Sequence, residues 1–382
     1  MHRIHWVGTG LSAVPGLRRL IGRGHPVTVW NRSPQKARAA VGDLTGEIRE
    51  FSLEALADAL APGDLLVSML PADWHLPLAR LGLEKAAHFV SSSYVAPEMR
   101  ALDAQARAAG LCLVNEVGLD PGIDHVMAHW LVADYRASGG FDEANALSFI
   151  SYCGGVPKQA NAFRYKFSWS PLGVLKALRA PSRSIAGFET VEAARPWDAL
   201  SRYRAPLPAP ERFEVYPNRD SLPFIAEYGF DPGWRVKQFV RGTLRLEGWA
   251  EAWADVFAQV EALAAGGDEA GLKALSDRLW QEHAYAPGEP DRVILCVALK
   301  AEAGDRVAYH RSWVLDAAGN ERGSAMAQLV SVPLSLAVEA VLAGEIAPGV
   351  STAPSDPALV ARWLETVGGI AQHLQLVDHA AP

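Results

Sequence analysis

The sequence predicts an α/β protein, in which an N-terminal domain built on a parallel sheet is followed by a second, α+β domain. Up to about residue 126, short apolar segments with strand character alternate with helical segments. Strands separated by helices of about 10–15 residues indicate βαβ units and therefore a parallel sheet. From about residue 127 this alternation stops, and longer β-like segments, aromatic residues and Pro-rich stretches take its place.

Composition narrows the class of protein. A chain of 382 residues is long for one domain, so two or three are expected. A hydrophobic fraction of 49% and a charged fraction of 21% are typical of a soluble globular protein. The 36 basic and 43 acidic residues give a net charge of −7 without a basic block, which argues against nucleic acid or an anionic membrane as the main partner.

Several further classes of protein are not expected. No run approaches the ~20 consecutive apolar residues of a membrane span, and the N-terminus does not resemble a signal peptide. Cys112, Cys153 and Cys296 are far apart and odd in number, so we expect neither a disulfide framework nor a cysteine zinc site. No set of His, Asp and Glu has metal-ligand spacing, so we predict no metal. The expected compartment is the cytoplasm.

The first strand, expected at residues 2–7, leads into Gly8-Thr9-Gly10-Leu11-Ser12-Ala13 and then a helix to about residue 23. In this G-x-G-x-x-A motif the first Gly makes a tight turn and the second lets a pyrophosphate approach the backbone. Ala13 keeps the helix close to the strand, and the phosphate lies on the helix N-terminus. Pro15 is tolerated in the first turn of that helix. The motif predicts a Rossmann dinucleotide-binding domain.

The second strand, expected at residues 26–30, ends at Asn31-Arg32-Ser33. An NAD site usually places an acid here, which binds the ribose hydroxyls and would repel a 2′-phosphate. Here the acid is missing, and an Arg and a Ser stand where that phosphate would lie, so we predict NADP. The alternative is that Ser33 with Pro34 only caps the next helix and Arg32 is solvated.

Three further strands are expected at residues 64–70, 88–91 and 111–114, with helices at 52–60, up to 87, and at 97–109. The strands end in polar or turn residues at 68–71, 91–94 and 115–125. In open α/β sheets the carboxyl ends of the strands form the ligand crevice. These three segments are therefore the expected cofactor and substrate surface.

The segment 115–125 contains Gly118-Leu119-Asp120-Pro121-Gly122, which cannot continue a strand because Pro lacks a backbone donor and Gly accepts positive φ. Its carboxylates and His125 gather where the backbone turns. The plainer interpretation is a turn that caps the next helix, with Asp120 or Asp124 as N-cap. We assign Asp120 to the site, and Asp124 and His125 to holding the turn.

The second domain is expected at residues 127–324. Its predicted elements are strands at 146–152 and 236–247, a helix from 174, a helix at 249–265, and a hairpin of 292–301 with 306–315. The tail, about 325–382, is expected to be helical and to complete the first domain of residues 1–126.

Several blocks taken together resemble the saccharopine dehydrogenase (saccharopine reductase) family, in its glutamate-forming branch. The blocks span nearly the whole chain and are the Gly8–Gly10 motif, Ser68–Pro71 with His75, Ser92–Met99, Asn115–His125, Ser151–Gly155, Tyr165–Ser170, Tyr216–Ser221, Arg241–Arg245 and Ser324–Ala327. The resemblance implies NADP as cofactor and an amino-acid substrate, saccharopine, converted to or from 2-aminoadipate 6-semialdehyde plus glutamate.

The resemblance also assigns site residues by block. It places the cofactor against Gly8, Gly10, Leu11, Ser12, Asn31, Arg32, Ser33, Ser92, Ser93, Gly118, Leu119, Asp120 and Ser170. It places the substrate against Ser93, Tyr94, Asp120, Arg219, Thr243, Leu244 and Arg245. The chain departs from the family pattern in a short loop at 156–161, and at Arg164, where a Gly commonly stands.

The implied chemistry gives these residues roles. Saccharopine carries three carboxylates, which an Arg can bind bidentately, so Arg219 and Arg245 are the expected anchors; the alternative is a solvated Arg. Tyr94, Asp120 and Cys153 are the ionisable groups expected to transfer protons. For Tyr94 the alternative is an orienting hydrogen bond, and for Cys153 a small buried side chain.

Two other functions remain open. A carboxynorspermidine synthase-like enzyme also forms C–N bonds, but its amine substrate would need an acidic pocket, which Arg219 and Arg245 argue against. A non-catalytic NADP-binding sensor is the third hypothesis. His75 and His125 are assigned to structuring turns. An exposed sheet in the second domain makes a homodimer possible.

Overall fold

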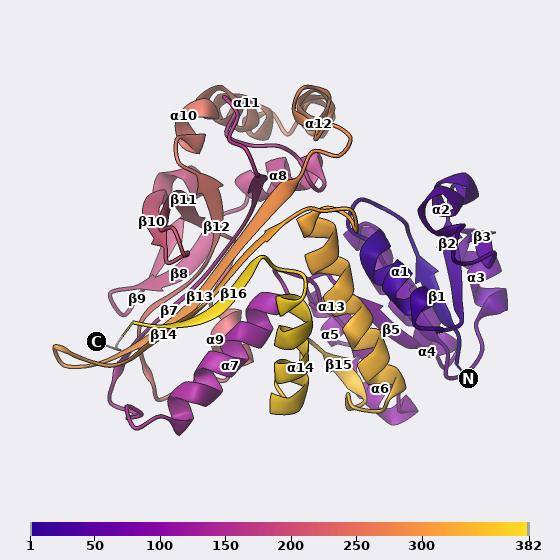
Figure 1. Ribbon diagram of the computed structural model, residues 1–382, viewed down its shortest axis with the longest axis horizontal. Coiled ribbons are helices and arrows are strands. Elements are labelled where there is room, and N and C mark those ends of the chain that lie inside the picture. The colour runs from indigo at the N-terminus through magenta and orange to yellow at the C-terminus, as the bar shows by residue number, and fades with distance from the viewer. Residues whose placement is uncertain (1, 380–382) are drawn as a thin grey trace. The chain divides into compact units, whose positions relative to one another are not determined.

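The computed structural model describes residues 2–379, which divide into two compact units (Figure 1). The first unit comprises the chain up to Val126 together with Ala327–Val367. The second comprises Met127–Met326 together with the residues from Gly368 onward. Helix α7, Ile123–Ala137, and helix α13, Ala325–Leu342, each run from one unit into the other.

The first unit is built on a sheet of seven parallel strands in the order β15-β6-β5-β4-β1-β2-β3. From β3 to β6 this is the Rossmann order, and the strand order reverses between β1 and β4. The central strands are fully buried, as expected when helices cover both faces. The strands are β1 Ile4–Val7, β2 Val27–Asn31, β3 Ile48–Glu50, β4 Leu65–Ser68, β5 His88–Ser91, β6 Cys112–Val114 and β15 Gly349–Ser351.

Helices connect these strands and cover the sheet. The buried faces of the helices within residues 53–109 join one core with Trp30, Leu66 and Phe89 of the strands. The helical segments are α1 Val14–Gly22, α2 Pro34–Val41, α3 Leu53–Ala59, η1 Ala72–Trp74, α4 His75–Glu84, α5 Pro97–Arg100, α6 Asp103–Ala109, α13, and α14 Pro357–Gly368.

Helix α1 packs directly on α13. A Cβ added at Gly16 would lie 1.9 Å from the carbonyl oxygen of Ser331, so only Gly permits this approach. The Gly16 amide also donates to Ser331 Oγ at 2.8 Å. This contact joins α1 to a helix more than 300 residues away in the chain.

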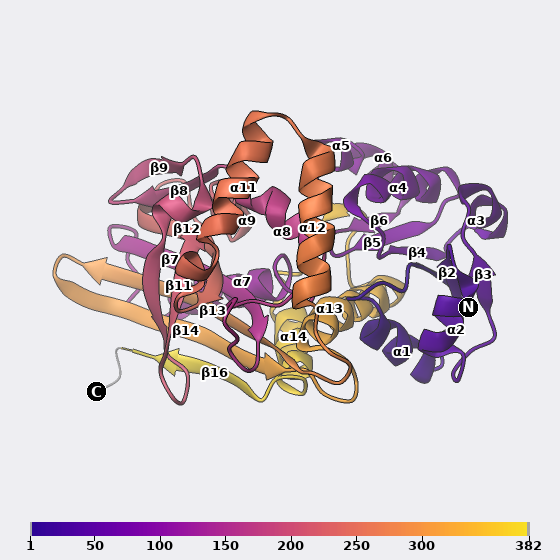
Figure 2. The same ribbon diagram turned by 90° about the horizontal axis from the view of Figure 1, so that it is seen from above.

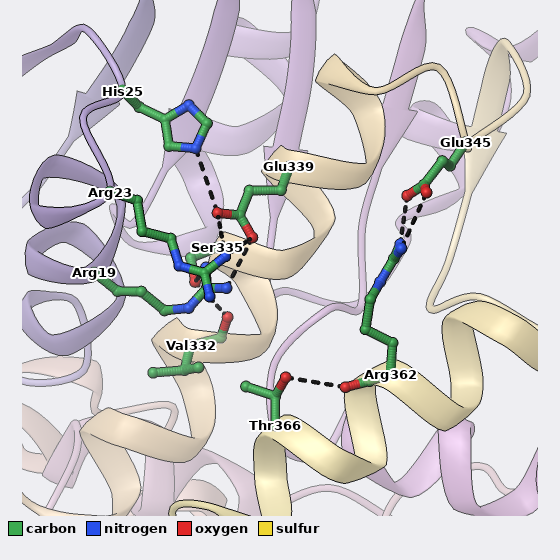
Figure 3. A network of polar contacts seen from close by, with 9 residues as sticks. All are labelled: Arg19, Arg23, His25, Val332, Ser335, Glu339, Glu345, Arg362 and Thr366. Atoms are coloured by element: carbon green, nitrogen blue, oxygen red, sulfur yellow. Dashed lines mark hydrogen bonds and ion pairs between the residues drawn. The ribbon is translucent and has the colours of Figure 1, made fainter.

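A polar network reinforces this helix pair (Figure 3). Arg19, Arg23 and His25 converge on Glu339 of α13, with nitrogen–oxygen distances of 2.8, 3.2 and 3.3 Å. Burial alone would raise the pKa of Glu339, but the hydrogen bond and charge of Arg19, with its neighbours, outweigh it and lower that pKa. The network therefore holds an ionised carboxylate between the glycine-motif helix and α13.

The second unit contains a sheet of nine strands, whose main path is β10-β11-β12-β7-β13-β14-β16, with β8 on β12 and β9 on β8. Only β12 and β7 pair in parallel. The strands are β7 Ala146–Pro157, β8 Ser182–Ala186, β9 Glu189–Ala193, β10 Ser201–Ala205, β11 Glu211–Pro217, β12 Arg235–Leu246, β13 Asp291–Ala303, β14 Arg306–Ala318 and β16 His373–Asp378.

Helices of the second unit enclose an aromatic core that includes Tyr165, Trp249 and Trp253. Helices α11 and α12 lie beside each other (Figure 2). The helical segments are α8 Pro171–Leu178, η2 Pro196–Ala199, α9 Pro223–Glu227, α10 Trp249–Ala252, α11 Ala254–Ala265 and α12 Glu269–His283.

The C-terminal tail differs from expectation. Helices α13 and α14 belong largely to the first unit, but the tail also forms β15 in the first sheet and β16 in the second. Strand β16 pairs antiparallel with β14 through six residue pairs, from Arg311 with Asp378 to Asp316 with His373. This short edge strand is stabilised by its neighbour, which a local pattern cannot reveal.

Other boundaries are also corrected. The helices expected at 97–109 and 249–265 are each divided into two segments, and the Pro-rich region 180–235 holds β8 to β11. Helix α13 is long and apolar enough to span a membrane by length and composition, although no such helix was expected. It is 78% buried, and a core helix meets the same criteria.

Candidate functional site

The glycine motif has the geometry of a phosphate loop. Gly8 has φ +101, and a Cβ there would lie 2.9 Å from the Met69 carbonyl oxygen. A Cβ at Gly10 would meet nothing within 4 Å, so the backbone there is open to a ligand. No side chain caps the N-terminus of α1, and Pro15 lies in its first turn as predicted. A dinucleotide pyrophosphate therefore fits this loop.

At the end of β2, Asn31 Nδ2 donates to Thr9 Oγ1 of the glycine motif at 2.7 Å. Arg32 is exposed and makes no ion pair with any residue of the described chain. Ser33 occupies the N-cap position of α2, but its hydroxyl makes no capping hydrogen bond and instead contacts Gln35. The arrangement leaves a cation and a hydroxyl beside the expected ribose position, and it does not support a capping role for Ser33.

Tyr94 and Asp120 come together after β5 and β6. The Tyr94 hydroxyl donates to Asp120 Oδ1 at 3.2 Å, and both side chains are partly buried. Gly118 packs on Ser92, where an added Cβ would lie 3.0 Å from the Ser92 Cβ. Leu119 is buried, so its side chain is not presented to a ligand. A phenol and a carboxylate in contact can share and transfer a proton.

A buried triad of ionisable groups holds this turn. His125 Nε2 lies 2.7 Å from Glu116 Oε2, and His125 Nδ1 lies 3.4 Å from Asp124 Oδ1. Asp124 Oδ1 also accepts from the Gly122 amide at 2.7 Å. All three side chains are nearly or fully buried. Asp124 and His125 thus hold the turn around Asp120.

Glu116 is a residue that the sequence did not single out. It has φ +57, and its Oε1 accepts from the Val95 amide at 2.8 Å, while its own amide donates to the Ser93 carbonyl at 3.1 Å. It therefore fixes the backbone on both sides of Tyr94. The signal available in the sequence was an acid directly after a buried strand, next to Asn115.

A second polar chain crosses the ends of β4 and β5. His75 Nδ1 lies 2.9 Å from Ser68 Oγ, and His75 Nε2 lies 2.7 Å from Ser93 Oγ. His75 is 7% exposed, and burial lowers the pKa of its imidazole to about 4. The imidazole is therefore neutral near pH 7.

We expect the free energy of unfolding to fall as the pH drops from 6.5 towards 4, in part because of His75. In that window the unfolded chain takes up a proton at His75 while the folded chain does not, so protons favour unfolding. A pKa lowered from 6.5 to about 4 corresponds to about 3 kcal/mol. Urea unfolding measured across this range should show a smaller loss for His75→Gln; parallel curves would contradict the assignment.

In the second unit, Arg245 of β12 lies among aromatic rings. Its guanidinium carbon is 4.9 Å from the ring centre of Tyr165, 5.6 Å from that of Tyr216 and 5.4 Å from that of Trp249. Arg245 is 6% exposed. Within the described chain it makes no ion pair, and its Nε has no hydrogen-bond partner. A buried cation without a carboxylate partner is costly unless a ligand supplies one.

The nearest acid on the neighbouring strand does not serve as that partner. Glu214 stands opposite Arg245 in the register of β11 and β12, but its carboxylate accepts from the amides of Gly248 and Ala250 at 2.9 and 2.8 Å. Burial raises the pKa of both Tyr165 and Tyr216, and the charge of Arg245 opposes that rise. The surroundings of Arg245 are thus neutral phenols and an indole.

The other predicted residues of the second unit occupy different environments. Cys153 is buried and pairs in register with Thr243, which is partly buried. Leu244 is fully buried in the core on the other face of β12, so only its backbone can meet a substrate. Arg219 is exposed, with φ +56. Ser170 caps α8 by accepting from the Gly173 amide at 3.1 Å.

Arg164, where the family resemblance led us to expect a Gly, has φ +56, in the left-handed region that favours Gly. The three cysteines are free and buried. Among residues 2–379, no three His, Cys, Asp or Glu residues gather as metal ligands.

Two family models match the chain. Residues 4–114 match the model described as "Saccharopine dehydrogenase NADP binding domain", and residues 118–370 match "Saccharopine dehydrogenase C-terminal domain". Among solved structures, saccharopine dehydrogenase (L-Glu forming) from Saccharomyces cerevisiae is similar with a TM-score of 0.81 and 25% identity, over 100% of both chains.

Curated relatives cover the chain less completely. Saccharopine dehydrogenase [NADP(+), L-glutamate-forming] from Pyricularia oryzae is 35% identical over 260 residues, which are 64% of this chain and 54% of that protein. Alpha-aminoadipic semialdehyde synthase from Arabidopsis thaliana is 38% identical over 203 residues, which are 52% of this chain and 18% of that protein. The matched part of this chain thus spans about half of the length of the first relative and less than a fifth of the length of the second.

Proposed function

The chain belongs to the saccharopine dehydrogenase family, and from this premise we propose that it is an NADP-dependent oxidoreductase acting on the secondary amine of saccharopine. The products of oxidation are 2-aminoadipate 6-semialdehyde and glutamate, and the reverse reaction joins them. The observation that carries this proposal is the contact of Tyr94 with Asp120 at the strand ends of an NADP-binding domain.

NADP is held by the first unit in this proposal. The Gly8–Gly10 loop and the uncapped N-terminus of α1 bind the pyrophosphate, and Arg32 with Ser33 binds the 2′-phosphate. When bound, NADP+ accepts the hydride from the carbon that becomes the aldehyde. Residues of the chain position the reactants and manage protons.

Asp120 and Tyr94 are the groups proposed to move protons. The amine nitrogen must lose its proton before oxidation, and hydrolysis of the imine requires a base for water and an acid for the departing nitrogen. Asp120 acts as base at the nitrogen, and Tyr94, which donates to Asp120 Oδ1, orients it and passes on the proton. Cys153 is the third candidate; its thiol is buried.

The substrate class follows from the charges of the second unit. Arg245 is a buried cation without an ion-pair partner in the described chain, and it suits one of the three carboxylates of saccharopine. Arg219 and Thr243 are proposed to bind the others. This charge pattern disfavours the polyamine-forming alternative, a carboxynorspermidine synthase-like enzyme, whose amine substrate needs acidic groups.

The test is direct. The purified protein is incubated with NADP+ and saccharopine, and the absorbance of reduced nicotinamide is followed, with glutamate measured as the second product. Growth of both signals supports the proposal. NADPH binding without turnover of saccharopine or its reverse substrates would favour the NADP-binding sensor instead.

Replacing Arg32 with Ala should raise KM for NADP+ about tenfold or more and leave KM for NAD+ nearly unchanged. The guanidinium is exposed and carries no ion pair in the described chain, so its charge is available to a 2′-phosphate; charge-assisted contacts of this kind contribute about 1.5–3 kcal/mol. Steady-state kinetics with both cofactors measures the ratio. Arg38→Ala, an exposed Arg in the last turn of α2, is the matched control; equal effects on both cofactors would contradict the assignment.

Assembly and location complete the proposal. We propose a homodimer and a cytoplasmic enzyme, with no nucleic-acid or membrane partner, in keeping with a net charge of −7. Light scattering coupled to gel filtration measures the oligomeric state, and a mass of one chain would exclude the dimer.

A further inference from the structure

His75 makes two hydrogen bonds that join the ends of two adjacent parallel strands. Ser68 is the last residue of β4, and Ser93 follows β5 by two positions. The imidazole spans them, with 2.9 Å to Ser68 Oγ and 2.7 Å to Ser93 Oγ. Both ring nitrogens are used, so His75 itself has no polar atom left for a ligand.

The two serines differ in exposure. Ser68 is fully buried, whereas Ser93 is partly exposed on the side where the strands end. Strand β4 borders the point where the strand order reverses, which is where a dinucleotide lies in this fold, and β5 is the next strand outward. Any influence of His75 on a ligand must therefore pass through the Ser93 hydroxyl.

The imidazole of His75 couples the hydroxyl of Ser68 to that of Ser93. A neutral imidazole has one N–H and one bare nitrogen, so it donates to one serine and accepts from the other. The tautomer that suits Ser68 consequently decides whether Ser93 turns its proton or its lone pairs towards a ligand. Charging the ring would make both nitrogens donors, and burial opposes that charge.

We propose that His75 is a positioning residue that fixes the direction of the Ser93 hydroxyl towards bound NADP. Both buried ring nitrogens are satisfied, and one of the two hydroxyls that satisfy them, that of Ser93, is partly exposed at the strand ends. Phe89 of β5 contacts the ring edge at 6.5 Å between centres and helps hold its plane. This inference rests on the proposed NADP function and deepens it.

The two nitrogens can be separated by substitution. In His75→Gln the side-chain amide reaches the former position of Nε2 and keeps a partner for Ser93. In His75→Asn the shorter amide reaches only the position of Nδ1 and Ser68. His88→Asn is the matched control, because His88 stands at the opposite end of β5 and its Nδ1 accepts from the Cys112 amide at 3.0 Å.

The experiment is a double-mutant cycle on NADPH affinity, measured by nicotinamide fluorescence, with Tm recorded for every variant. We expect His75→Asn and Ser93→Ala each to raise the Kd for NADPH about fivefold, which corresponds to the free energy of one lost hydrogen bond. The double variant should show no further loss, and His75→Gln and His88→Asn should stay within about twofold.

Two results would overturn the proposal. One is a Kd for NADPH that is unchanged by His75→Asn or by Ser93→Ala. The other is a double variant whose Kd rises by the product of the two single effects, because His75 would then act independently of Ser93, in a structural role. If His75→Asn does not fold, Ser68→Ala replaces it in the same cycle, and its effect must vanish in the Ser93→Ala background. The test measures NADPH binding and not turnover, so its result can be interpreted even if the protein does not oxidise saccharopine.

Discussion

Replacing Asp120 with Asn is expected to lower kcat for saccharopine oxidation about a thousandfold, within the range of 10²–10⁴ typical for loss of a general acid–base group. Asn keeps the size of the side chain and can still accept from the Tyr94 hydroxyl, which lies 3.2 Å from Asp120 Oδ1. It cannot take a proton from the substrate nitrogen. The Tm should change little, because the buried triad of Glu116, His125 and Asp124 still holds the turn.

The control for this substitution is Asp58→Asn, which removes the same charge from an exposed position on α3. Tyr94→Phe should cost less than Asp120→Asn, and the two losses should not add, because the residues act as one unit. A kcat within threefold of wild type would remove Asp120 from the catalytic groups.

Replacing Arg245 with Met is expected to raise KM for saccharopine about a hundredfold while leaving the folded chain as stable as before or more stable. The lost interaction is a charge-assisted hydrogen bond to a carboxylate, which contributes about 1.5–3 kcal/mol. The stability should not fall, because Arg245 is buried without an ion pair among the described residues and Met fills much of the same volume between aromatic rings.

This combination of weaker binding and unchanged or higher Tm distinguishes a ligand anchor from a structural cation. Calorimetry measures the Tm and steady-state kinetics measures KM for saccharopine and for NADP+, of which only the first should change. Arg202→Met, on an exposed side chain of β10, is the matched control. A large drop in Tm with an unchanged KM would show that Arg245 serves the aromatic core rather than the substrate.

The local sequence pattern predicted those parts of the protein whose structure depends on residues close together in the chain. The strand-to-helix turn at Gly8–Gly10 follows from where Gly is needed, and the Tyr94 and Asp120 segments follow from strands that end in polar residues. Parallel strands place their carboxyl ends at one edge, so the polar ends of β4, β5 and β6 could be assigned to one surface from the sequence. NADP was also predicted locally, from Arg32 and Ser33, and the resemblance to a family added the expected substrate.

The helices and strands that sequence misjudged depend on distant partners. Strand β16 exists because it pairs with β14. The aromatic residues of 249–265 suggested a single helix, but the chain divides it at Trp253. Propensity is a weak guide wherever such tertiary contacts outweigh it.

By itself, then, the sequence determined the fold class, the dinucleotide loop and the strand ends that carry Tyr94 and Asp120, because these depend on periodicity and backbone freedom within a few residues. Only the tertiary structure decided that Glu116 anchors both sides of Tyr94, that His75 joins Ser68 to Ser93, and that Arg245 is buried among aromatic rings without a carboxylate partner in the described chain. Each of these contacts either joins residues from different elements or depends on burial. Which residues meet and which are buried are both set by how the helices and strands pack.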